Sequence, residues 1–163
     1  MHMPRLSFCA LFLMAAAAWG ADPKRGGGPE FAVVASQDVP AENLTISDLR
    51  KLFLGDRQFW SPNLRVSLLL RAPVTRERAV VVWTICKMSE SQFGQHWIGK
   101  VMRADCTNSP RLFPSNQAAM DLVRTMSGAI AIVNAAQVPK GMKILSVEGK
   151  LAGQPGYKLQ IAE

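Results

Sequence analysis

Catalysis would need a nucleophile, a general base or a metal site, and this sequence offers few side chains of those kinds. Its two histidines are His2, in an apolar N-terminal segment, and His96, which no serine or cysteine motif accompanies. The phosphate loop G-x-x-x-x-G-K-[ST], the G-x-S-x-G turn and the H-E-x-x-H zinc motif are absent. We therefore expect no enzymatic activity, no cofactor and no metal ion, and we interpret His96 as a structural residue.

Binding of a small anion is better supported than catalysis. Where a strand of an open α/β sheet leads into a helix, free N–H groups and the helix dipole favour anions. The junction Arg71–Arg76 (RAPVTR) combines two guanidiniums with a hydroxyl, Ser115–Asn116 opens a helix, and Ser127–Gly128 forms a tight turn. Ser and Asn also cap helices for purely structural reasons. The candidate ligand-binding residues are Arg71, Thr75, Arg76, Ser115, Asn116, Ser127 and Gly128, with Arg71 and Thr75 the strongest.

Strands and helices that alternate along the chain would position these junctions. Apolar runs of strand length predict buried strands, the first of them parallel to its neighbours. The five expected strands are Phe31–Ala35, Arg65–Leu70, Ala129–Val133, Lys143–Val147 and Tyr157–Ile161.

Helix signals lie between these strands. Thr45 or Ser47 caps a helix that stops at Gly55, and Ser115 caps a helix over 116–126. The run AVVVWTI has strand-like composition, yet Thr75 can cap a helix before it, so we favour a helix over 76–87. Ser89 and Gln92 form a capping box ahead of a helix to about residue 103, with Phe93, Trp97, Ile98 and Val101 on one apolar stripe. Thr107–Pro114 is expected to be a loop.

Together these elements predict an α/β fold with an open, mixed or mostly parallel sheet flanked by helices. We expect one domain over residues 31–163, preceded by a flexible leader over 21–30 that contains the run GGGP. Residues 1–20 have the basic start, short apolar run and small-residue end of a cleaved export signal. An uncleaved anchor is the alternative, and no later stretch is apolar enough to span a membrane.

The net charge of +7 is scattered along the chain, without the block of like charges that marks a nucleic-acid-binding arm. The positive balance either attracts an anionic partner, such as a small oxyanion, an acidic protein face or an anionic membrane surface, or serves solubility alone. We therefore expect no nucleic acid among the partners. The sequence leaves the oligomeric state open.

Export would also determine how the cysteines are interpreted. If Cys9 is removed with the signal, Cys86 and Cys106 remain. In an oxidising compartment, the simplest expectation is a disulfide that closes a loop of about 20 residues and stabilises the fold by roughly 3 kcal/mol. Two free thiols are the alternative. A metal site is not expected, because zinc takes four ligands and these cysteines have no histidine neighbours.

The order of these motifs resembles the phosphate-type periplasmic solute-binding proteins of ABC transporters. The resemblance begins with Leu44–Asp56 (LTISDLRKLFLGD), continues through Trp60 and a strand ending in Arg71, and includes the aromatic helix around Gln95–Trp97. Ser115–Ala131 (SNQAAMDLVRTMSGAIA) is similar to the family's Ser-Asn … Val … Pro-Gly-Ala-Ile-Gly-Tyr block. The resemblance covers about residues 31–147 and implies a single lobe of a type 2 periplasmic-binding-protein-like fold.

The departures from the family qualify what the resemblance implies. The family's Arg-x-x-Gly-Ser-Gly-Thr anion loop is replaced by Arg71–Arg76, so only Arg71 and Thr75 correspond, and the chain is about half the family's length. The resemblance implies an exported, non-enzymatic protein that binds a small oxyanion such as phosphate weakly and is linked to ABC-type uptake. A membrane transporter or a periplasmic protein would be its partner. The alternative is an interaction or sensory module that kept the fold and lost the ligand.

Overall fold

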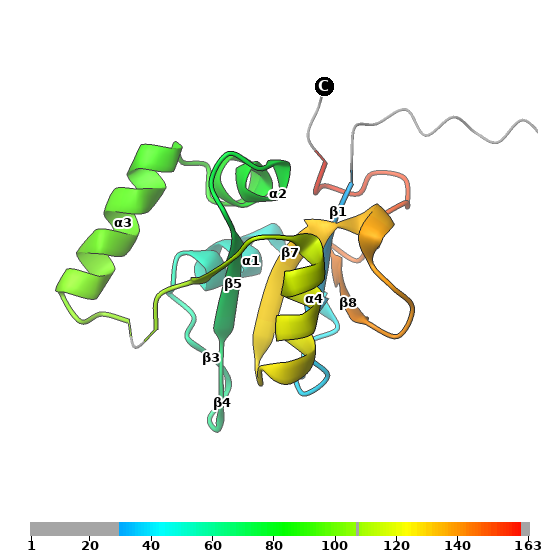
Figure 1. Cartoon of the computed structure of the whole chain (residues 1–163), viewed down its shortest axis with the longest axis horizontal. Helices are drawn as coiled ribbons and strands as arrows, with labels where there is room; N and C mark the ends of the chain where they lie inside the picture. Colours follow the sequence, from blue (N-terminus) through cyan, green and yellow to red (C-terminus); the bar gives the residue numbers. More distant parts are fainter. Residues whose placement is uncertain (1–29, 107, 161–163) are drawn as a thin grey trace, which may run out of the picture.

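The computed structural model describes residues 30–106 and 108–160 of the chain (Figure 1). The predicted signal and nearly all of the leader lie outside these residues, so the division into 1–20, 21–30 and 31–163 stays a prediction. Within the described part, no helix combines the length and apolarity needed to cross a membrane. The elements are β1 (Phe31–Ala35), β2 (Asn43–Leu44), α1 (Ile46–Phe53), β3 (Phe59–Ser61), β4 (Leu64–Arg65), β5 (Ser67–Arg71), α2 (Arg76–Ala79), η1 (Val80–Ile85), α3 (Glu90–Met102), β6 (Arg111–Phe113), α4 (Asn116–Thr125), β7 (Ala129–Asn134), η2 (Ala135–Gln137) and β8 (Lys143–Val147).

Six strands of the described part form one mixed sheet in the order β2-β8-β1-β7-β5-β6. β5 runs parallel to β6 and β7, and β2 runs parallel to β8. β1 runs antiparallel to both of its neighbours, β7 and β8. The predicted α/β sheet flanked by helices is confirmed, whereas the prediction that Phe31–Ala35 is a parallel strand is wrong. A continuous apolar run indicates that both faces of a strand are covered, and it does not specify the strand's direction.

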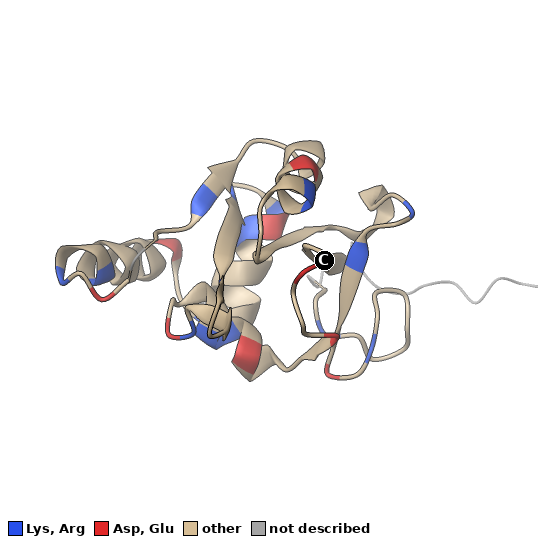
Figure 2. Ribbon diagram, turned by 90° about the horizontal axis from the view of Figure 1, so that it is seen from below, with Lys and Arg blue, Asp and Glu red and all other residues tan. Residues whose placement is uncertain are grey.

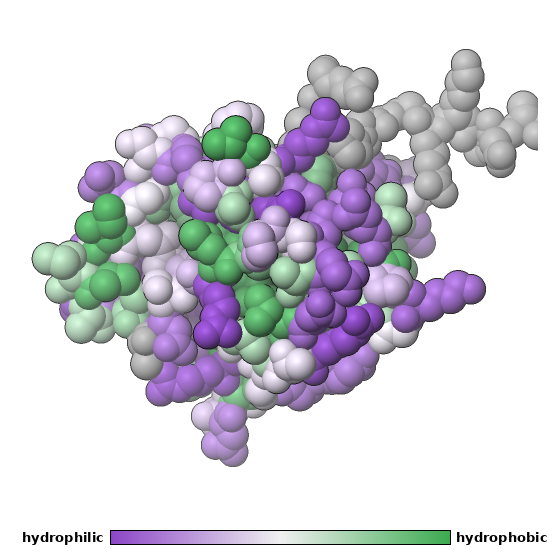
Figure 3. Space-filling model, viewed as in Figure 1, coloured by the Kyte–Doolittle hydropathy of each residue, from purple (hydrophilic) through white to green (hydrophobic). Residues whose placement is uncertain are grey.

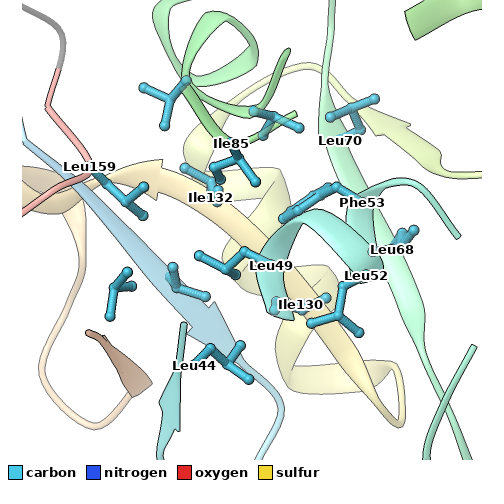
Figure 4. Packing of buried hydrophobic residues seen from close by; sticks show 14 of the residues in the cluster. Leu44, Leu49, Leu52, Phe53, Leu68, Leu70, Ile85, Ile130, Ile132 and Leu159 are labelled. Atoms are coloured by element: carbon cyan, nitrogen blue, oxygen red, sulfur yellow. The ribbon is translucent and has the colours of Figure 1, made fainter. Parts of the chain in front are cut away.

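Successive side chains of a strand point to opposite faces of the sheet, so the apolar interior is divided into two layers, one on each face. The larger layer packs against α1, η1 and α3, and Figure 4 shows Leu49, Leu52 and Phe53 of α1 among the side chains of β5 and β7. The smaller layer packs against α4, which covers the opposite face. Each fully buried aliphatic or aromatic side chain contributes roughly 1.5–3 kcal/mol. The strand residues of the larger layer include Val33, Leu68, Leu70, Ile130 and Ile132, and those of the smaller layer include Val34, Leu69, Ala131 and Val133.

Helix α1 begins and ends as its sequence predicts. The Thr45 hydroxyl accepts a hydrogen bond from the backbone N–H of Asp48 at 3.0 Å, and the backbone N–H of Thr45 donates to the Asp48 carboxylate at 3.0 Å. These reciprocal bonds form a capping box. The backbone N–H and the hydroxyl of Thr45 both donate to the Asp48 carboxylate, which lowers the pKa of this carboxyl below its ordinary value. The helix ends at Phe53, and Gly55 follows with a φ of 72°.

The ambiguous segment after Thr75 is helical, as favoured above. α2 continues without a break into η1, which is a π-helix in which the backbone N–H of Cys86 donates to the carbonyl of Val81 at 2.9 Å. Val80–Val82 are all buried in this segment. Burial against the sheet therefore outweighs the strand propensity of a valine run.

Helix α3 begins at the predicted Ser89–Gln92 capping box, but one of its faces was assigned wrongly. Phe93 and Trp97 are buried, whereas Ile98 and Val101 are 56% and 53% exposed. The buried stripe continues from Trp97 to Lys100, whose ammonium pairs with a carboxylate of the α1–β3 loop. The buried stripe of α3 therefore consists of Phe93, Trp97 and Lys100, and Ile98 and Val101 lie outside it.

Two segments near the edges of the sheet also differ from expectation. The predicted loop Thr107–Pro114 contains β6, an edge strand that pairs with β5. The expected strand Tyr157–Ile161, as far as Gln160 where the described part ends, forms only an isolated bridge to Glu30. The Tyr157 hydroxyl instead donates to the carbonyl of Phe31 at 2.6 Å, which holds this segment over β1 without a strand ladder.

The structure corrects the disulfide prediction, because Cys86 and Cys106 are free cysteines. Cys86 caps the end of η1 inside the core, and burial raises the pKa of its thiol to about 12. Cys106 is half-buried and packs against the same apolar layer. The number of cysteines and the expected compartment carry no information on whether two Cβ atoms face each other, which a disulfide requires.

Candidate functional site

The first candidate site lies at the carboxyl end of β5, where β5 and β6 end side by side. Arg71 pairs in register with Phe113, and its guanidinium carbon lies 5.8 Å from the centre of the Phe113 ring. The Thr75 hydroxyl caps α2 by accepting from the N–H of Arg78, and it donates to the carbonyl of Ala72 at 2.9 Å. Arg71 is therefore held in place by packing, and the hydroxyl of Thr75 is already used by the backbone.

The feature that sequence reasoning missed here is Glu77. Its side chain belongs to a residue that is only 9% exposed, and its Oε2 lies 4.0 Å from Nε of Arg71. Its Oε1 accepts a hydrogen bond from Nδ2 of Asn116 at 2.9 Å, and the same amide donates to Gln137 at 2.6 Å. A carboxylate of the chain thus lies between two of the anion-binding candidates, Arg71 and Asn116. The available signal was an acidic residue in the first turn of the helix that follows Arg71.

Some polar atoms at this site have no partner. Within the described residues, Nε and Nη1 of Arg71 and Oδ1 of Asn116 are buried without a hydrogen bond. Two donors and one acceptor left in this state indicate an incompletely satisfied polar cluster, which a water molecule or another small polar group could complete.

The remaining residues of the loop and the helix start face solvent. Val74, at the tip of the loop between β5 and α2, is fully exposed, and Arg76 is exposed as well. Ser115 caps α4 by accepting from the N–H of Ala118 at 3.1 Å. The structure therefore brings Arg71, Thr75, Arg76, Ser115 and Asn116 to one end of the sheet.

Ser127 and Gly128 lie at the opposite end of the sheet. They precede β7, whose first residue pairs with Ser67 at the start of the parallel strand β5, whereas Arg71 ends β5. Two of their hydrogen-bond donors are taken by Asp38: the Ser127 hydroxyl donates to the Asp38 carboxylate, and the N–H of Gly128 donates to it at 3.1 Å. The seven candidate residues therefore do not form one site. Each end of the sheet also holds a carboxylate of the chain itself, Glu77 at the Arg71 end and Asp38 at the Gly128 end.

Asp38 borders a hollow on the surface. This hollow has a volume of about 360 Å³ and lies between the β1–β2 loop, the end of α4 and the turn before β8. Arg71 does not line it. Its lining consists of Ala35–Asp38, Val123–Ser127 and Gly141–Lys143.

Hydrogen bonds from Ser127 and Ser36 hold the pKa of the Asp38 carboxyl below its ordinary value of 3.8. A lowered folded-state pKa contributes stability that is fully present above the ordinary value and is lost as pH falls through the lowered value. We expect Asp38→Asn to destabilise the protein more at about pH 7 than at about pH 3, measured by urea unfolding at each pH.

Asp121→Asn is the matched control, because Asp121 forms an exposed ion pair with Arg124. Its effect should be small at both pH values. An equal loss of stability at both pH values for Asp38→Asn would contradict the role assigned to the Asp38 charge.

His96 has a structural environment. Its Nε2 lies 2.8 Å from the carbonyl oxygen of Leu54, and its ring meets the Trp97 ring edge-on. Among the described residues, no group of three or more His, Cys, Asp or Glu side chains could hold a metal ion. His96 therefore links α3 to the end of α1.

Comparison with known proteins identifies the fold. No family model matches the sequence, and no curated protein matches it. Among solved structures, a protein described as a phosphate ABC transporter substrate-binding protein, with bound phosphate, from Clostridium perfringens is similar with a TM-score of 0.59 and 13% identity, covering 76% of this chain and 46% of that one. An ABC-type phosphate transport receptor from Vibrio cholerae is similar with a TM-score of 0.56 and 16% identity, and the match covers 77% of this chain and 49% of that one. PstS from Borrelia burgdorferi is similar with a TM-score of 0.63 and 13% identity, and the match covers 83% of this chain and 56% of that one.

At these identities the likeness shows the fold, which is that of periplasmic binding proteins. The chain spans about half the length of these solved structures. The expectation of a binding-protein-like α/β fold is therefore confirmed.

Proposed function

We propose that this chain is an exported, non-enzymatic binding-protein-like domain whose anion position is filled by its own carboxylate. It acts by contacting a membrane transporter or a periplasmic protein and does not carry free phosphate. The observation that carries this proposal is Glu77, whose carboxylate lies between Arg71 and Asn116. The likeness of the fold to phosphate-binding proteins of ABC transporters supports the proposed setting.

The physical argument is electrostatic. A phosphate beside Arg71 would lie close to the Glu77 carboxylate, and two like charges about 4 Å apart repel by about 4 kcal/mol at an effective dielectric constant near 20. That energy corresponds to roughly a thousandfold loss of affinity. The loop offers little compensation, because Pro73 has no N–H and the Thr75 hydroxyl is already bonded. The Glu77 carboxylate therefore excludes a competing anion.

Removal of the Glu77 charge tests this proposal. We expect wild-type protein to give no binding heat with phosphate at millimolar concentration, and Glu77→Gln to gain affinity by roughly a hundredfold or more. The glutamine keeps an oxygen that can accept from Asn116. Isothermal titration calorimetry measures both. Glu90→Gln is the matched control, since it removes a carboxylate that pairs with Arg78 at the half-exposed start of α3.

The second arm of the experiment concerns the partner. Tagged wild-type protein should retain a defined protein from an extracytoplasmic extract, and added phosphate should leave this retention unchanged. Wild-type binding of phosphate at micromolar concentration would overturn the proposal.

Weak binding of a small oxyanion such as phosphate is the second candidate function. The observation that favours it is the pair of unpartnered donors, Nε and Nη1 of Arg71, in a buried position. Wild-type binding at millimolar concentration that Arg71→Gln abolishes would establish this function in place of the first.

A further inference from the structure

The outward face of α3 has a composition that the proposed function does not explain. Ile98, Val101 and Met102 are 56%, 53% and 81% exposed. Figure 3 shows apolar side chains gathered over α3, which stands at the side of the molecule in Figure 1. The opposite face of the helix is buried through Phe93 and Trp97. A helix that is apolar on two faces is normally covered on both, and the residues that the structure describes cover one of them.

In the part of the chain that the structure describes, the outward face of α3 also carries no unpaired Lys, Arg, Asp or Glu side chain. The charged side chains of α3 and its C-cap are all engaged within the chain, so the face does not require an oppositely charged partner. A second copy would therefore bring the charges of its own α3 already paired within that copy. The charged side chains of α3 and its C-cap form three ion pairs, Glu90–Arg78, Lys100–Asp56 and Arg103–Asp105. Figure 2 shows the remaining Lys and Arg positions spread over several elements.

The spacing on this face makes it complementary to itself. Gly94 and Met102 each lie four residues, about one turn, from Ile98. A Cβ added at Gly94 would meet nothing within 4 Å, so the helix surface is open there. In an antiparallel contact with a two-fold axis at Ile98, Gly94 of one copy faces Met102 of the other. A long, flexible methionine fills the space beside a glycine.

We propose that this chain forms a homodimer through the outward face of α3, with the two-fold axis near Ile98. The three apolar side chains expose on the order of 400 Å² per copy, about half of what each partner contributes to a standard interface. The dimer is therefore weak and forms at high protein concentration. This proposal is independent of phosphate binding, because α3 lies outside the Arg71 site.

Sedimentation equilibrium of the purified protein between about 10 μM and 1 mM tests the dimer, since weak interfaces dissociate in this range. We expect a reversible dimer, and we expect Ile98→Lys to weaken it at least tenfold. Leu151→Lys is the matched control, because Leu151 is an exposed apolar residue outside α3 that is 42% exposed. Circular dichroism should show that both variants keep the fold.

Cysteine pairing tests the register of the contact. In a background with Cys106→Ser, a mixture of Gly94→Cys and Met102→Cys proteins should form a disulfide-linked dimer faster than either protein alone. A protein that stays monomeric up to about 1 mM would overturn the proposal. A dimer that Ile98→Lys leaves intact, or cysteines that link no faster in the mixture, would also overturn it.

Discussion

Gly128→Ala is expected to destabilise the protein by about 3 kcal/mol or more. Gly128 has a φ of 66°, and a Cβ built on it would lie 1.9 Å from the carbonyl oxygen of Arg65. The backbone cannot easily move away. The carbonyl of Gly128 accepts from Nε1 of Trp60 at 2.9 Å and from the N–H of Ser67 at 2.9 Å, and its own N–H donates to Asp38. The methyl group must therefore break at least one of these bonds.

Gly141→Ala separates the clash from the cost of the backbone conformation. Gly141 also has a positive φ, 88°, but a Cβ there would meet nothing within 4 Å. Gly141→Ala should lower the free energy of unfolding by about 1–2 kcal/mol, the usual cost of a left-handed conformation for an L residue. Urea unfolding measures both variants. Equal losses for the two would mean that Arg65 moves aside freely, and the argument from close contact would fail.

Trp97→Ala is expected to have the second large effect, a loss of about 3–5 kcal/mol. Trp97 is 8% exposed and attaches α3 to α1. Its Nε1 donates to the carbonyl of Phe53 at 3.2 Å, and its ring packs so closely on Gly55 that a Cβ there would lie 2.7 Å from Cη2. Removal of the ring would leave a cavity between the helix and the core.

Trp97→Phe distinguishes the packing contribution from the hydrogen bond. Phenylalanine retains much of the apolar contact and loses the indole donor, so a loss of about 1–2 kcal/mol is expected. Urea unfolding followed by circular dichroism is suitable, because the substitutions remove a fluorophore. A loss below about 1 kcal/mol for Trp97→Ala would show that α3 is held by other contacts.

Local chemistry explains what the sequence predicts well in this fold. Ser89 and Ser115 are predicted as helix caps, and Thr45 as one of two candidates, because a hydroxyl satisfies a free N–H in its own first turn, which involves only a few neighbouring residues. The glycine stop at Gly55 follows from the same kind of rule. Strands β1, β5, β7 and β8 are recognisable because each contains a run of consecutive apolar residues.

The errors concern interactions between residues that are distant in sequence. The direction of β1 depends on which strands flank it, and the outward position of Ile98 depends on which face of α3 packs against the rest of the chain. The pairing of Cys86 with Cys106 was inferred from their number and the expected compartment, and the structure has both free. None of these relations leaves a periodic signal in the sequence.

In the candidate site, too, local signals identified some residues, and the positions of others depend on contacts between distant segments. Arg71 and Asn116 were identified as anion-binding candidates from strand-end and helix-start signals, and the structure places both at one end of the sheet. Glu77 was missed because its position between them depends on how α2 lies against α4. Gly128 was assigned to the same site, although the parallel pairing of β5 with β7 places it at the other end.

The position of β1 in the sheet has a consequence for the order in which the chain can fold. In the described part of the chain, the strands that pair with β1 are β7 and β8, so residues 31–35 find these partners about a hundred positions later, at 130–134 and 143–145. During synthesis the first strand must therefore wait, unpaired, until nearly the whole domain has been made. A nascent chain that ends before residue 129 lacks both neighbours of its central strand and should remain a substrate for chaperones.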